Sequence, residues 1–132
     1  MPAVFGWLAL DRRGRWSIKS TAPAGSADAA RQFDRLTNPK VIEFIGRNYT
    51  HEEQGRWYFQ NGPQRVYVTL DYTPLVYRIV GAHPLSFETH TGVACAVVQA
   101  VWMDEAGDLL LVTEHGPGLL LDRDLPRGLE AL

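Results

Sequence analysis

The sequence predicts an α+β protein: a strongly bent, mainly antiparallel meandering sheet of about eight or nine short strands, with one or two helices early in the chain. Three charged loops that end in glycine separate apolar stretches, at residues 11–14, 52–55 and 104–107. Glycine suits the end of such a hairpin loop because that position commonly requires a positive φ. Apolar residues at helical spacing occur within residues 26–49, which places the helices early.

Length and composition indicate a single folded domain spanning residues 1–132. The first two loops both continue as Gly-Arg-Trp, at residues 14–16 and 55–57. This recurrence suggests two related halves, residues 1–82 and 83–132, as an alternative organisation. The hydrophobic fraction of 45% and the charged fraction of 21% are those of an ordinary globular protein.

The net charge limits the classes of partner that we expect, and the cysteine content indicates the cellular compartment. A formal net charge of -2 gives no general attraction to nucleic acid or anionic lipid. No stretch approaches the roughly 20 apolar residues that cross a bilayer. Cys95 is the single cysteine and lies in an apolar run, which is typical of a reduced thiol in a cytosolic protein. We therefore expect a cytoplasmic protein without a nucleic-acid or membrane partner.

The first hairpin is predicted from the apolar stretch 3–10, which lacks the basic leader and cleavage pattern of a signal peptide. With residues 11–14 as its loop, Ala9 opposes Trp16 and Trp7 opposes Ile18. Directly opposed residues share a sheet face. We therefore expect Trp7, Ala9, Trp16 and Ile18 to form the core face of this hairpin.

Two helices are predicted next. Ser26 is a candidate N-cap for a short helix in which Ala30, Phe33 and Leu36 recur at helical spacing. A second helix is predicted to begin at Pro39, because Asn38 is a good N-cap and proline is tolerated in the first turn. Its apolar stripe consists of Val41, Ile42, Phe44, Ile45 and Tyr49, and Gly46 is expected to end the helix by about residue 48.

The second hairpin has a clear alternating pattern. With residues 61–64 as its loop, Tyr58 opposes Tyr67 and Phe59 opposes Val66. One set of side chains is expected to face the core: Trp57, Phe59, Val66, Val68 and Leu70. The other set is expected to face outward: Arg56, Tyr58, Gln60, Arg65, Tyr67 and Thr69.

The C-terminal half is predicted to contain strands at residues 75–80, 86–90 and 119–121, with a charged surface tail from Asp122 onward. A third hairpin joins residues 96–103 to residues 108–113. Its predicted faces are Ala100, Trp102, Leu109 and Leu111 on one side and Val101, Met103, Leu110 and Val112 on the other. Because both faces are apolar, we expect this hairpin to be central or to form a homodimer interface through residues 96–113.

Residues 41–49 (VIEFIGRNY), followed by residues 55–68 (GRWYFQNGPQRVYV), resemble an uncharacterised domain family of proteobacteria. The order of Gly-x-Trp, helix, hairpin and strand, and then residues 87–92 (FETHTG), is similar to another bacterial family of unknown function. That resemblance implies an α+β fold with repeated motifs and a signalling role. Neither resemblance carries over a catalytic residue.

The candidate partner site is the outward face of the second hairpin, where Tyr58 and Tyr67 are accompanied by Arg47, Arg56 and Arg65. Aromatic residues and arginine are enriched in binding hot spots. The competing interpretations are that a helix covers this face or that the tyrosines only stabilise a solvated sheet. If the face instead binds a partner, the protein is a non-enzymatic binding or regulatory module whose partner is an unidentified protein or small ligand.

The alternative function is a small metabolite-binding protein or enzyme with a pocket formed by Glu88, His90 and His115. It requires those side chains to converge in a concave pocket. The four histidines match no recognised ligand spacing and the chain has no glycine-rich phosphate loop, so we expect neither a metal nor a cofactor. Small apolar neighbours are expected to raise the pKa of Cys95, and no catalytic residue is assigned.

Overall fold

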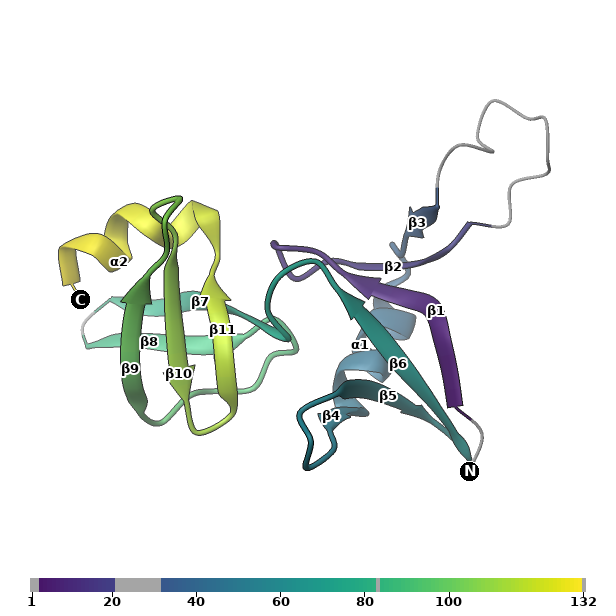
Figure 1. The fold of residues 1–132 in the computed structure, drawn as a ribbon. Helices are drawn as coiled ribbons and strands as arrows, with labels where there is room; N and C mark the ends of the chain where they lie inside the picture. Colours follow the sequence, from purple (N-terminus) through teal and green to yellow (C-terminus); the bar gives the residue numbers. More distant parts are fainter. Residues whose placement is uncertain (1–2, 21–31, 83, 132) are drawn as a thin grey trace. The chain divides into compact units, whose positions relative to one another are not determined.

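The computed structural model describes residues 3–20, 32–82 and 84–131 (Figure 1). The chain forms two compact units, one of residues 1–11 and 15–71 and the other of residues 12–14 and 72–132. The expected halves 1–82 and 83–132 differ from these units. The reason is that strand β7 (Leu75–Ala82) pairs with later strands and therefore belongs with them.

The first unit contains a six-stranded sheet in the order β3-β2-β1-β6-β5-β4. The β1–β6 pair is parallel and the other pairs are antiparallel. The sheet curls around α1, the one helix among the residues of this unit that the structure describes (Figure 1). Its elements are β1 (Ala3–Leu10), β2 (Trp16–Lys19), β3 (Phe33–Arg35), α1 (Pro39–Arg47), β4 (Tyr49–His51), β5 (Trp57–Asn61) and β6 (Gln64–Leu70).

The second unit contains a five-stranded sheet in the order β8-β7-β11-β10-β9, in which only β7 and β11 are parallel. Its core includes Tyr77, Leu111 and Leu120, which are almost completely buried. Its elements are β7, β8 (Leu85–Thr89), β9 (Val98–Met103), β10 (Leu109–Thr113), β11 (Gly116–Leu120), the 3-10 helix η1 (Asp122–Asp124) and α2 (Leu125–Ala131).

Helix α1 confirms the prediction from Asn38 and Pro39. The Asn38 side-chain oxygen accepts hydrogen bonds from the backbone N–H groups of Lys40 (3.0 Å) and Val41 (3.4 Å), which lack partners inside the helix. At the other end, Asn48 caps the helix by donating from its side-chain amide to the carbonyl oxygen of Phe44 (2.8 Å).

The placement of both helices early in the chain was wrong. Helix α1 begins at Pro39 as predicted, but α2 occupies the C-terminal end, where a surface tail was expected. Ser26 and Ala30 lie outside the described residues, but Phe33 belongs to a strand. That strand, β3, pairs with β2, and the pairing satisfies its backbone hydrogen-bonding groups. Three apolar residues at helical spacing are too weak a signal to specify a helix against this pairing.

The first hairpin has a different register from the one predicted. Leu10 pairs with Trp16 and Leu8 with Ile18, because the loop has five residues, with the N–H of Asp11 donating to the carbonyl of Arg15 (3.1 Å). The shift moves the β1 side chains to the other face, whereas Trp16 in β2 is buried as predicted. The core face therefore carries Leu8 and Leu10, whereas Trp7 is 49% exposed.

The third hairpin shows the same error. Met103 pairs with Leu109 and Trp102 with Leu110, and the N–H of Asp104 donates to the carbonyl of Asp108 (2.9 Å) across another five-residue loop. The prediction that this hairpin is central holds for β10 only. Strand β9 is an edge strand, and Trp102 is 56% exposed.

Candidate functional site

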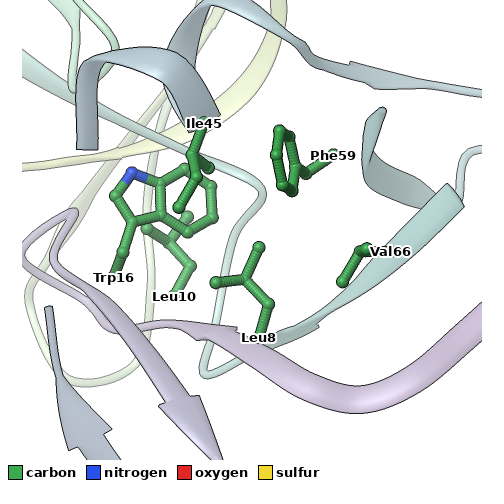
Figure 2. Close-up of a cluster of buried hydrophobic side chains, with 6 residues drawn as sticks. All are labelled: Leu8, Leu10, Trp16, Ile45, Phe59 and Val66. Carbon is green, nitrogen blue, oxygen red and sulfur yellow. The ribbon is translucent and has the colours of Figure 1, made fainter. Parts of the chain in front are cut away.

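The core of the first unit is a cluster of six buried side chains that converge from five elements (Figure 2). The sheet and α1 each contribute to it, with Ile45 as the helix's buried residue. The cluster consists of Leu8, Leu10, Trp16, Ile45, Phe59 and Val66. These residues hold α1 against the concave side of the curled sheet.

Beside this cluster lies an apolar groove with a volume of about 540 Å³, all of it within the first unit. Strands β1, β2, β5 and β6 contribute to its walls together with α1 and the segment before that helix. The groove is lined by Trp7, Leu8, Ile18, Lys19, Leu36, Val41, Phe44, Ile45, Phe59, Asn61 and Val66.

Four of the apolar side chains that line the groove are left half exposed by the fold. Trp7 is 49% exposed, Ile18 and Val41 are each 41% exposed, and Phe44 is 43% exposed. Phe44 contacts the buried Phe59 ring edge-on, with the centroids 5.5 Å apart. A contiguous set of this kind marks an interaction surface more often than scattered single residues do.

An irregularity in β1 explains the exposure of Trp7. Gly6 has a positive φ of 76°, and the pairing with β6 shifts register between Val4 and Leu8. Such bulges re-aim the side chains next to them. Leu8 therefore enters the core while its neighbour Trp7 stands at the wall of the groove.

Two polar residues line the groove. Lys19 at the end of β2 holds its ammonium group 5.3 Å from the centroid of the Trp7 ring, within the range of a cation–π contact. Asn61 lies at the end of β5. The groove is therefore an apolar surface with one cationic group and one amide at its margin.

The predicted partner face has the expected register but not the expected exposure. Tyr58 pairs with Tyr67 and Phe59 with Val66, which confirms the predicted pairing. However, Tyr58 and Tyr67 are only 8% and 9% exposed, so the prediction of outward, accessible rings was wrong. The cover is neither a helix nor solvent: it comes from arginine side chains and from Phe5.

This cover is a layer of stacked groups. The guanidinium of Arg65 lies 4.5 Å from the centroid of the Tyr58 ring, and that of Arg56 lies 4.8 Å from the centroid of the Tyr67 ring. Phe5 stacks on Tyr67 with the centroids 4.6 Å apart. Long arginine stems bury apolar surface while their charged ends stay at the boundary with water.

Glu52 pairs with both arginines of this layer. Its carboxylate accepts hydrogen bonds from Arg56 and from the Tyr67 hydroxyl (3.0 Å) and lies 3.6 Å from Arg65. The hydrogen bond from Arg56, with the Tyr67 and Arg65 contacts, holds the pKa of Glu52 below its ordinary value. Arg47 is separately paired with Glu43 (3.1 Å). The predicted cationic face is therefore largely satisfied within the chain.

The family model described as "Protein of unknown function (DUF2946)", named DUF2944, matches residues 1–132. The chain belongs to this family. Two solved structures of DUF1285 family proteins are similar in fold to this DUF2944 member. The protein from Silicibacter pomeroyi DSS-3 has a TM-score of 0.61 and 17% identity, over 98% of this chain and 71% of that one. The protein from Shewanella baltica OS155 has a TM-score of 0.62 and 15% identity, over 95% and 91%.

No curated protein matches the sequence of this DUF2944 member. At these identities the structural likeness establishes the α+β fold and no activity. Among the described residues, no helix is both long and apolar enough to cross a bilayer.

The three residues of the predicted alternative pocket have separate partners in this DUF2944 member. Glu88 is paired with Arg78, His90 accepts a hydrogen bond at Nδ1 from the N–H of Val76 (3.1 Å), and His115 Nε2 lies 2.8 Å from the carbonyl oxygen of Ala94. The Glu88–Arg78 pair joins β8 to β7, and each of the two histidines contacts a backbone group.

A different cluster forms in the second unit, where Cys95, Glu114 and His115 place their ligand-type atoms within 4.8 Å of one another. The Glu114 carboxylate accepts from the N–H groups of Ala96 (2.5 Å) and Val97 (3.2 Å). Burial and the nearby Glu114 and Glu88 carboxylates raise the pKa of Cys95, as expected for an unreactive thiol. We interpret this cluster as a tie that holds residues 94–97 against the end of β10.

Sequence reasoning missed the groove. One signal for it was present, because the apolar stripe of α1 is wider than the face that a short helix can bury against a sheet. Of its members, Ile45 is buried whereas Val41 and Phe44 remain half exposed. The position of Trp7 and Lys19 in the groove lining depends on the register of the first hairpin. Because that register was predicted wrongly, their position could not be predicted.

Proposed function

We propose that this protein is a non-enzymatic binding module and that its site is the apolar groove of the first unit. The observation that supports this function is a groove of about 540 Å³ whose walls are already apolar and accessible. Small-molecule sites typically have volumes of about 300–1,000 Å³ and mostly apolar walls with few polar groups.

The energetics favour an apolar occupant. Fully burying a valine, leucine or phenylalanine side chain is worth about 1.5–3 kcal/mol. Because these side chains are only half buried in the free protein, a ligand that covers them gains part of that free energy. Trp7, Ile18, Val41 and Phe44 are such side chains. A ligand that covers them is bound mainly by removing this surface from water.

The test is a titration of the full chain with dodecanol, followed by tryptophan fluorescence, since Trp7 lines the groove. We expect saturable quenching or a blue shift in the wild type. Val41→Asp is expected to weaken binding by at least about tenfold because it places a charge in the apolar wall.

Val80→Asp is the matched control, since Val80 is a half-exposed valine in β7 of the second unit (54% exposed). It is expected to bind like the wild type. If Val41→Asp is folded by circular dichroism and binds dodecanol as tightly as Val80→Asp, the groove is not the site.

The second unit supports a further proposal, that of a homodimer. Strand β9 is an edge strand, and Val97, Trp102 and Met103 beside or within it are 54–59% exposed. An exposed apolar edge strand is a template for pairing with another chain, here a second copy. Light scattering at micromolar concentration is expected to show a dimer that Trp102→Lys dissociates; a wild-type monomer would refute this proposal.

The finer role that fits this binding module is regulation or signalling in the cytoplasm. The occupied groove would report the presence of its ligand, and the reduced, half-buried Cys95 fits a cytosolic setting. Ligand binding that leaves the oligomeric state unchanged would argue against a regulatory role.

A further inference from the structure

We propose that the ligand of the groove is an elongated single-chain amphiphile with one carboxylate head group, which pairs with Lys19. This inference rests on the proposed function of the groove and assigns the chemical class of its occupant. Three properties of the groove support it: its length, its polarity and the position of its one charged residue.

The residues that line the groove come from four neighbouring strands of the sheet. It extends from Lys19 in β2 to Asn61 in β5, and β1 and β6 lie between these two strands in the sheet order. Neighbouring strands are about 4.8 Å apart, so three intervals correspond to about 14 Å, somewhat less where the sheet curls. A flexible alkyl chain of moderate length fits such a channel better than a compact ring.

The lining of the groove is almost entirely apolar. Nine of its eleven lining residues are apolar, and the exceptions are Lys19 and Asn61. Burying an ionised group against apolar walls is costly unless an opposite charge receives it. The charged end of an amphiphile therefore belongs at Lys19 and its alkyl chain along Ile18, Val41 and Phe44.

Lys19 is available for this pairing. Its ammonium group is held over the Trp7 ring at the wall of the groove. Within the described ranges of the chain, no carboxylate lies within 4.0 Å of it. A single ammonium group matches a single negative charge, which favours a carboxylate over a more highly charged phosphate.

The chain itself offers no obvious occupant from the segment that follows Lys19 and Ser20. Residues 21–31 (TAPAGSADAAR) contain no apolar side chain larger than proline. Such a segment cannot supply an alkyl-like insert for an apolar channel. The occupant is therefore expected to be a separate molecule.

The experiment compares dodecanoate with dodecanol on the full chain at about pH 8, where the carboxylate is ionised. Both are used below the concentration at which they aggregate. We expect the wild type to bind dodecanoate about two- to fivefold more tightly, which is the size of an exposed ion pair. Lys19→Gln should abolish that preference without weakening dodecanol binding, and Lys19→Glu should reverse it.

Lys40→Gln is the control, since Lys40 is an exposed lysine of α1 that does not line the groove. It should keep the wild-type preference. Equal binding of the two ligands by wild type and Lys19→Gln would overturn the head-group assignment and leave the apolar groove standing. Binding of neither ligand would overturn the proposed function as well.

Discussion

Tyr67 in β6 donates its hydroxyl hydrogen to Glu52 over 3.0 Å, so the loop between β4 and β5 is tied to the next strand of the sheet. The same carboxylate receives Arg56 and lies beside Arg65, the two residues whose guanidinium groups cover the paired tyrosines. The carboxylate of Glu52 thus contacts three members of a layer that was predicted to be a free binding face.

Glu52→Gln is expected to lower the free energy of unfolding at neutral pH and to flatten its dependence on acid. The pKa of folded Glu52 is held below its ordinary value of 4.5, chiefly by the hydrogen bond from Arg56. The unfolded chain therefore takes up this proton first, and the stabilisation is full above about pH 4.5 and is lost as the pH falls through the folded-state pKa.

Urea unfolding of both proteins over a range of pH measures this effect, with Glu53→Gln in the same loop as the control. The difference between wild type and Glu52→Gln should be largest at neutral pH and should shrink in acid. A difference that stays constant with pH would contradict the assigned ion pair.

The glycines that close the first two loops are expected to differ in their tolerance of alanine. Gly14 and Gly55 both have positive φ, 78° and 92°. A Cβ at Gly55 would meet nothing within 4 Å, whereas one at Gly14 would lie 2.6 Å from the Cβ of His90. Gly55→Ala should cost about 1–2 kcal/mol from backbone strain alone, and Gly14→Ala about 1–3 kcal/mol more from overpacking. Equal losses of stability in denaturant unfolding would count against this packing.

Asp124 is expected to be important for the stability of the second unit. Asp124 is 5% exposed, and its carboxylate accepts a hydrogen bond from the N–H of Ile79 in β7 (3.0 Å). Asp124→Ala leaves that buried donor without its acceptor, at a cost of about 1–3 kcal/mol. Asp124→Asn retains an oxygen and should cost less. If the two variants unfold at the same urea concentration, the hydrogen bond is not what Asp124 contributes.

The elements that could be predicted are those whose signals are local. Asn38 and Pro39 define the start of α1 through groups that neighbour one another in the chain, and the alternation around Gly62 gave the pairing of Tyr58 with Tyr67. The same local evidence was insufficient for the first and third hairpins. Their loops contain five residues, and the extra residue reverses the faces of Leu8, Trp7 and Trp102.

The groove and the arginine cover could not be predicted because both depend on contacts between distant segments. The parallel pairing of β1 with β6 brings Phe5 onto Tyr67, and the bulge around Gly6 turns Trp7 toward the groove. Nothing local to residues 3–10 specifies a partner strand some sixty residues later along the chain. Likewise, the burial of Tyr58 and Tyr67 could be predicted only by knowing that Glu52 pairs with the two arginines that cover them.

The most direct test of the proposed binding site is a titration of the ¹⁵N-labelled full chain with dodecanoate, followed by backbone amide chemical shifts. We expect concentration-dependent shifts at groove positions, including Ile18, Lys19, Val41 and Phe44, and little change at β9 and β10 of the second unit. Shifts confined to the second unit, or none at saturating ligand, would contradict the assignment of the groove as the binding site.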